Sequence, residues 1–159
     1  MLMGYKFNVS APGLVKYATG ILVVITLWLA GAESSLARAD SSIVLITNKD
    51  TALDSITTET ARAVFAMRLR SLPDGSAAHV FVLPDDNPLH DDFCKQVLGV
   101  YPHQLRLAWD RAVFSGTGQA PNVVESVEEM MEKVAALPGS IGYVQKGQAD
   151  ERVRILPLD

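Results

Sequence analysis

Residues Ile43–Thr47 read IVLIT, a continuous apolar run that is rich in β-branched side chains. Such a run predicts a strand that is covered on both faces. A second run of this kind, Val80–Leu83, follows after a helical segment that begins at Thr57 or Thr58 and continues through Phe65. A strand, a helix and a strand in this order indicate the α/β fold class.

The second half of the chain carries signals for three helices and two short strands. A favourable N-cap followed by proline starts the first helix. Apolar residues three to four positions apart mark the second helix, and a capping-box pattern starts the third. We expect these helices at 88–98, 102–115 and 127–137, and the strands at 141–144 and 153–156.

The first 39 residues are expected to be a secretory signal peptide. Lys6 and Lys16 precede the apolar run 20–32, and small residues before position 40 fit a signal peptidase, with cleavage after Ala39. The apolar run is short, because about 20 residues are needed to span a bilayer as a helix, so an uncleaved anchor is the less favoured alternative. We therefore expect a periplasmic or secreted domain of residues 40–159.

Net charge and cysteine content exclude several classes of function. The chain has 159 residues and a net charge of −4, and loss of the leader leaves a domain with a net charge of −6. This acidic balance lacks the basic footprint of a nucleic-acid-binding protein and disfavours binding to anionic lipid. A single cysteine, Cys94, excludes a disulfide framework and a multi-cysteine metal site. Its apolar neighbours predict a buried, small hydrophobic side chain.

No residue pattern points to catalysis, a metal or a cofactor. Ser115 lies in the stretch 114–118, FSGTG, which follows a helix, whereas a nucleophile elbow lies between a strand and a helix. A glycine C-cap explains this stretch. The acidic stretch 85–92 contains His90 but lacks EF-hand spacing, and zinc would need more histidine or cysteine ligands. On this reading His90 is a surface or packing histidine.

Two loops that follow strands are candidates for anion binding, because strand ends and helix N-termini offer free backbone amides. One is the stretch 47–49, Thr-Asn-Lys, and the other begins at Asn87. Four carboxylates crowd the second loop with negative charge, namely Asp85, Asp86, Asp91 and Asp92. The spacing alone therefore makes a weak case for anion binding.

Several short motifs, in their order along residues 42–157, carry a family resemblance. They include Val-Leu-Gly at 97–99, Phe-Ser-Gly at 114–116 and, as the most specific, Pro-Gly-Ser-Ile-Gly-Tyr-Val at 138–144. With them the chain resembles short members of the phosphate ABC-transporter substrate-binding family, a branch of the type II periplasmic binding proteins. The resemblance implies a reduced type II binding-protein fold, with a mixed sheet flanked by helices.

The resemblance also implies a function and a set of ligand-binding residues. The function is that of an exported, non-catalytic solute-binding protein for phosphate or a similar small oxyanion, in ABC-type transport with a membrane permease. His90 stands where short relatives often have arginine. The alternative is a ligand-free interaction or sensory module of the same fold that docks on a membrane partner. The implied ligand-binding residues are Thr47, Asn48, Lys49, Asn87, Leu89, His90, Ser115, Gly116 and Thr117.

Overall fold

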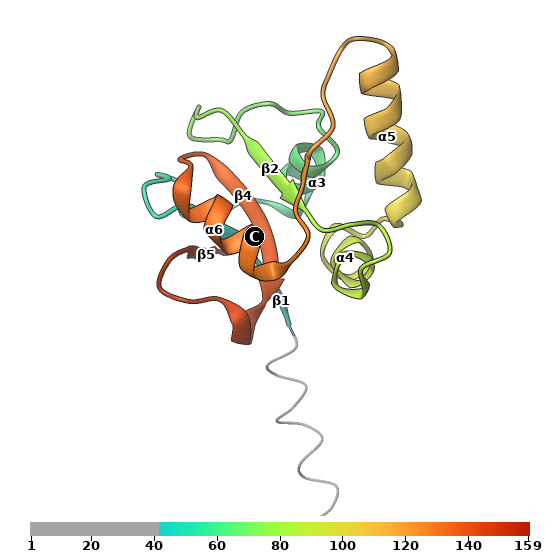
Figure 1. Cartoon of the computed structure of the whole chain (residues 1–159). Coiled ribbons are helices and arrows are strands. Elements are labelled where there is room, and N and C mark those ends of the chain that lie inside the picture. The colour runs from blue at the N-terminus through green and yellow to red at the C-terminus, as the bar shows by residue number, and fades with distance from the viewer. Residues whose placement is uncertain (1–41) are drawn as a thin grey trace, which may run out of the picture. The chain divides into compact units, whose positions relative to one another are not determined.

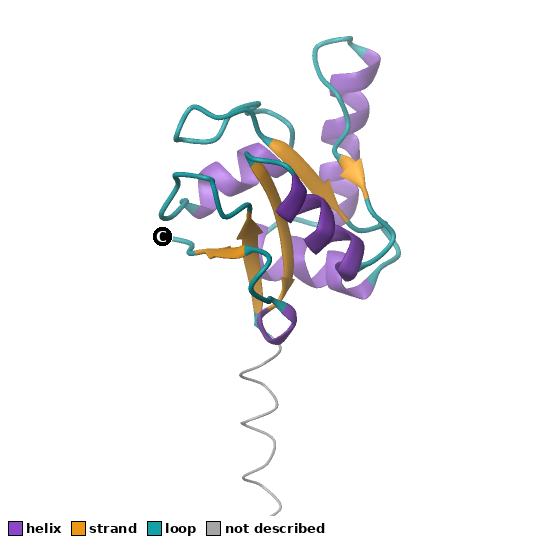
Figure 2. Cartoon of the chain, turned by 60° about the vertical axis from the view of Figure 1, so that its left-hand side comes forward, coloured by secondary structure: helices purple, strands orange, loops and turns teal. Residues whose placement is uncertain are grey.

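The computed structural model of the protein describes residues 42–159, so the predicted signal peptide lies outside the described residues. Figure 1 shows the order of the elements along the chain, and Figure 2 separates helices from strands. In this part of the chain, no helix has both the length and the apolar character needed to cross a membrane. The elements are β1 (Ile43–Thr47), α3 (Thr58–Phe65), β2 (His79–Val82), α4 (Pro88–Asp92), η1 (Phe93–Leu98), α5 (Pro102–Phe114), β3 (Asn122–Val123), α6 (Val127–Ala136), β4 (Ser140–Gln145), η2 (Lys146–Gln148) and β5 (Arg154–Leu156).

The five strands form one mixed sheet in the order β3-β2-β4-β1-β5, which confirms the expected fold class. β1 runs antiparallel to both of its neighbours, β4 and β5. β2 runs parallel to β4 on one side and to β3 on the other. The carboxyl end of β1 therefore lies at the opposite end of the sheet from the carboxyl ends of β2, β3 and β4.

Helices cover both faces of this sheet, and two consecutive residues of β4 show this, because successive side chains of a strand point to opposite faces. On β4, Gly142 faces α6, where an added Cβ would lie 2.9 Å from the sulfur of Met130. Glycine at this position therefore allows α6 to lie close against β4, as Figure 1 shows. The next residue, Tyr143, faces the other layer, where its ring stacks on Phe93 with a centroid separation of 3.8 Å and meets the edge of Phe65.

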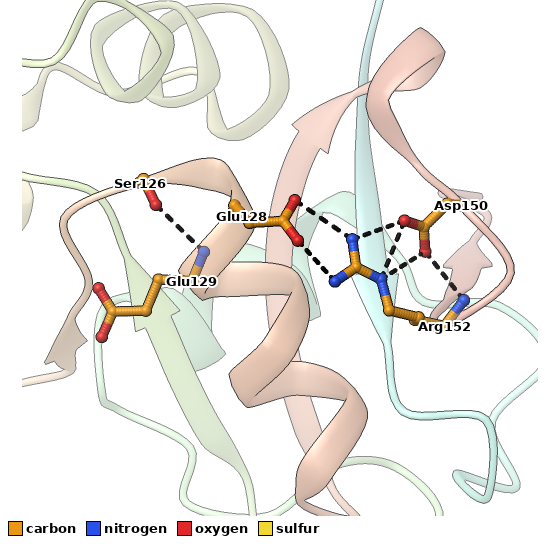
Figure 3. Close-up of polar contacts among 5 residues, drawn as sticks. All are labelled: Ser126, Glu128, Glu129, Asp150 and Arg152. Atoms are coloured by element: carbon orange, nitrogen blue, oxygen red, sulfur yellow. Dashed lines mark hydrogen bonds and ion pairs between the residues drawn. The ribbon is translucent and has the colours of Figure 1, made fainter.

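Three helix N-caps that the sequence predicts are confirmed. The side chains of Thr57, Asn87 and Ser126 each accept a hydrogen bond from a backbone N–H in the first turn of the following helix. The Ser126 bond to the N–H of Glu129 is drawn in Figure 3. The reciprocal half of the capping box is displaced by one residue, because the Glu129 carboxylate accepts from the N–H of Glu125.

The expected helix 88–98 differs from a regular α-helix. Its first part, α4, is α-helical, and its second part, η1, is a π-helix that ends at Gly99 in the left-handed conformation. Three of its buried residues, His90, Cys94 and Leu98, are four positions apart. In an α-helix of 3.6 residues per turn, side chains four positions apart are rotated by about 40° relative to each other around the helix axis. The wider turn of the π-helix reduces this rotation and helps to keep all three on the core side.

α5 is attached to the core through one narrow face. Leu105 and Trp109 are its buried residues, whereas Phe114 is 88% exposed. The indole N–H of Trp109 donates to the carbonyl oxygen of Phe65 at the end of α3, at 2.8 Å. The far end of α5 and the loop after it extend away from the sheet in Figure 1 and Figure 2. The Trp109 contact is therefore a main anchor of this helix.

The Trp109→Phe variant tests this anchor. The change leaves the Phe65 carbonyl oxygen without its donor and removes part of a buried ring, so we expect the free energy of unfolding to fall by about 2 kcal/mol in urea titrations. The matched control is Leu107→Ala on the exposed side of α5, which should change stability by less than about 0.5 kcal/mol. Equal effects of the two changes would show that Trp109 does not anchor α5.

Candidate functional site

The first predicted anion loop, residues 47–49, has its polar side chains committed to the fold. The Thr47 hydroxyl is buried and donates to the carbonyl oxygen of Ser140 at 2.8 Å. The Asn48 amide nitrogen lies 3.1 and 2.7 Å from the carbonyl oxygens of Val134 and Ala135 at the end of α6. Thr47 and Asn48 therefore join the loop to β4 and α6. The Lys49 side chain, by contrast, is exposed.

The structure does not bring the first predicted loop together with the second, which contains Asn87, Leu89 and His90. Thr47 pairs with Ile141, the same residue that pairs with Val80 at the start of β2. The first loop thus lies beside the beginning of β2, whereas the second loop follows the end of β2. Strand ends meet at one edge of a sheet only where the strands are parallel, and the antiparallel direction of β1 places the two loops at opposite ends of the sheet.

The Asn48→Ala variant distinguishes a structural from a ligand-binding asparagine. Removal of the amide leaves two carbonyl oxygens of α6 without this donor, so we expect the free energy of unfolding to fall by about 1–2 kcal/mol in the absence of any anion. Lys49→Ala, at the exposed neighbour, is the control and should leave stability within about 0.5 kcal/mol of the wild type. The reverse order of effects would contradict the structural role of Asn48.

His90 lies in the core, where it contacts three polar groups. Its Nδ1 is 2.6 Å from the hydroxyl oxygen of Tyr143, which also accepts from the backbone N–H of Leu83 at 2.9 Å. Its Nε2 is 3.9 Å from an oxygen of Asp85 and 3.6 Å from the sulfur of Cys94. Burial lowers the pKa of His90 and favours the neutral ring. Because the Tyr143 hydroxyl oxygen already accepts from Leu83, we assign its hydrogen to the bond with Nδ1 and the ring hydrogen to Nε2, on the side of Asp85 and Cys94.

This arrangement resembles a cysteine–histidine–aspartate triad only in composition. The Cys94 side chain is fully buried, and burial raises the pKa of its thiol to about 12. A nucleophilic cysteine needs a lowered pKa and access to its substrate. Cys94 is therefore the buried small side chain that the sequence predicts, and His90 is a packing histidine. Across residues 42–159, no three His, Cys, Asp or Glu side chains gather as a metal-ion site requires.

The lowered pKa of His90 predicts a dependence of stability on pH. Above about pH 6.5 the histidine is neutral in both the folded and the unfolded chain. As the pH falls below 6.5, the unfolded chain binds a proton more readily than the folded chain, so the free energy of unfolding decreases. In urea titrations at several pH values, we expect His90→Gln to reduce this decrease, and His103→Gln, at an exposed histidine, to retain it. If the free energy of unfolding of His90→Gln fell with pH as much as that of the wild type, His90 would not be the source of the pH dependence.

Two surface hollows meet between α3 and α5. The first, of about 370 Å³, includes Arg62 and an apolar floor, and the second, of about 460 Å³, includes Arg111. The two share four lining residues and thus form one continuous groove. Two hydroxyl residues of the third predicted stretch, Ser115 and Thr117, line the second hollow. The four shared residues are Ala66, Arg68, Gln104 and Ala108.

The arginines of residues 42–159 that form no ion pair with a carboxylate all line this groove. The seven arginines within residues 42–159 divide into two groups. Arg106, Arg152 and Arg154 lie outside the groove, and each is in an ion pair with at least one carboxylate. Figure 3 shows Arg152 between two such carboxylates. The other four line the groove and form no ion pair within the described residues, and we call them the groove arginines: Arg62, Arg68, Arg70 and Arg111.

The backbone places the groove arginines and the hydroxyls through two left-handed residues. Met67, with a φ of 57°, follows the end of α3 and turns the chain so that the next residues run along the groove. Gly116, with a φ of 69°, ends α5 in the same way, which confirms the predicted glycine C-cap. Arg70 links the two turns by donating to the carbonyl oxygen of Thr117. Nothing in the sequence pattern around Met67 indicates this turn.

Solved structures of bacterial binding proteins resemble this fold. An ABC-type phosphate transport receptor from Vibrio cholerae matches with a TM-score of 0.57 at 12% identity, over 73% of this chain and 45% of the other. A Clostridium perfringens protein, described as a phosphate ABC transporter substrate-binding protein and solved with bound phosphate, matches with a TM-score of 0.59 at 15% identity, over 73% and 44%. PstS from Borrelia burgdorferi matches with a TM-score of 0.56 at 17% identity, over 74% and 47%.

The chain has a periplasmic binding protein fold. This confirms the fold that the sequence motifs imply. The chain spans less than half the length of each of these binding proteins. No protein-family model and no curated protein matches its sequence. The likeness is therefore one of fold.

Proposed function

We propose that the protein is an exported, non-catalytic binding protein for a small oxyanion, with phosphate as the first candidate, that acts in ABC-type transport. The observation that carries the proposal is the set of groove arginines, on a fold that resembles phosphate transport receptors. Arginine is suited to this task because its planar guanidinium binds phosphate oxygens through two parallel hydrogen bonds. The proposal includes removal of the leader after Ala39.

The anion would occupy the second hollow of the groove. Arg68 and Arg111 are free of carboxylates there. The Ser115 hydroxyl donates to the carbonyl oxygen of Arg111 at 2.6 Å and lies 2.8 Å from the Thr117 hydroxyl, so Thr117 is the hydroxyl of this pair that can donate to the anion. These groups surround the carbonyl end of α5, where the helix dipole opposes an anion. The arginine charges are thus needed to offset the dipole. The first predicted loop takes no part in this site, because Thr47 and Asn48 bond within the fold.

A second function, that of a ligand-free docking module, is favoured by a different observation. Asn87 uses its side-chain oxygen to accept the Leu89 N–H, and His90 is buried. The two loops that the family resemblance makes into one anion site lie apart. Their polar side chains other than the exposed Lys49 have partners within the fold. The chain also spans less than half of each of the solved receptors it matches. Both facts fit a domain whose surface contacts a membrane partner.

Thermal melting of residues 40–159 with phosphate, sulfate or chloride at matched ionic strength separates these two functions. A ligand at one hundred times its Kd adds about 2.7 kcal/mol of stability, so a specific site raises the midpoint for phosphate above that for the other anions. We expect Arg111→Ala to abolish this rise. Lys146→Ala, which removes the same charge from an exposed position outside the groove, should retain it.

Two results would contradict the oxyanion proposal. Equal midpoints in all three anions would favour the docking module. A phosphate-specific rise that persists in the Arg111 variant would place the anion outside the second hollow. Mass spectrometry of the protein recovered from secreting cells tests the export part, because a mature chain that begins at Asp40 is expected.

A further inference from the structure

The first hollow of the groove has features that binding of a single phosphate does not use. Its floor is made of apolar side chains, with Ala63 from α3, Val100 before α5, and Leu105 and Ala108 from α5. Arg62 and Arg68 line this hollow with the floor. The hollow therefore offers apolar contact and positive charge side by side. This pairing fits a ligand that carries both kinds of group.

We propose that the groove docks an acidic segment of a partner protein, with apolar side chains on the alanine-rich floor and carboxylates on the groove arginines. Charge complementarity supports this occupant. The protein is acidic overall, yet the groove is lined by four arginines and one carboxylate, Glu59. Arginines elsewhere in residues 42–159 are neutralised by carboxylates of this chain. Two groove arginines donate to backbone carbonyl oxygens, Arg62 to Leu98 and Arg70 to Thr117, but none of the four is in an ion pair within the described residues, so their positive charges remain for carboxylates of another chain.

The size of the groove leaves room for a peptide segment beyond the small anion of the oxyanion proposal. Its two hollows, of about 370 and 460 Å³, each lie within the roughly 300–1,000 Å³ of sites that hold ligands of drug size. One inorganic anion fills a small part of such a space. The apolar floor argues against an inorganic chain of phosphates, which has no apolar surface to bury.

The test uses fluorescence anisotropy with a fluorescein-labelled peptide in which leucines recur every three or four residues among glutamates. Two control peptides replace all glutamates by lysine or all leucines by glutamate. We expect binding of the first peptide only, weakened by added salt because the contacts are ionic. Equal binding of the all-glutamate peptide would overturn the role of the apolar floor. Absence of binding by the leucine–glutamate peptide would overturn the docking proposal itself.

The Ala63→Glu variant tests the location. Ala63 is half-buried on α3 and lines only the first hollow, and glutamate is compatible with a helix. The added charge and bulk should weaken peptide binding by about tenfold or more, which corresponds to roughly 1.4 kcal/mol. Gln148→Glu, on an exposed residue outside the groove, makes the same charge change and should bind as the wild type does. Unaltered binding in Ala63→Glu, with a wild-type melting midpoint, would overturn the location.

The outcome of this test is separable from that of the oxyanion proposal. Ala63→Glu leaves the residues of the second hollow unchanged, so a phosphate-dependent rise in melting midpoint should survive in it. Peptide binding without any phosphate effect would support docking and contradict the oxyanion function. A phosphate-dependent rise in melting midpoint without peptide binding would support the oxyanion function and contradict docking.

Discussion

The hydroxyl of Tyr143 is the contact on which the arrangement of the domain depends. It joins three elements at one buried point, because Tyr143 belongs to β4, Leu83 follows β2 and His90 belongs to α4. The aromatic ring of Tyr143 stacks on the ring of Phe93 in η1. This one side chain thus fixes the end of a strand and the helix that follows it against the central sheet. Each member of this buried polar network has a hydrogen-bond partner, and burial keeps the histidine ring neutral.

The sequence predicts the elements better than their directions. The apolar runs locate β1, β2 and β4, and the caps Thr57, Asn87 and Ser126 locate the helix starts. A strand buried on both faces has the same pattern whichever way it runs, so the antiparallel direction of β1 cannot be read from its residues. The two-residue strand β3 is exposed and too short to have a pattern. Its position follows from pairing with β2.

The residues of the candidate site, too, are only partly predictable from the sequence. Ser115 and Thr117 are singled out by sequence and do line the groove, whereas Thr47 and His90 are used inside the fold. Three of the groove arginines, Arg62, Arg68 and Arg70, come from α3 and the turn after it, whereas Arg111 lies on α5, and nothing in the sequence marks it as their neighbour. What distinguishes them is the lack of a carboxylate partner, and that property exists only once the ion pairs of the other arginines are known.

The pairing of β1 has a consequence for the moment at which the domain can form. Residues 43–47 find both of their partner strands near the other end of the chain, at 140–145 and 154–156. Contacts over such long separations are slow to form, because loop closure costs entropy before any pairing is gained. A chain that emerges from a ribosome or a translocation channel N-terminus first therefore cannot complete its sheet early. The topology delays folding until nearly the whole chain has been delivered.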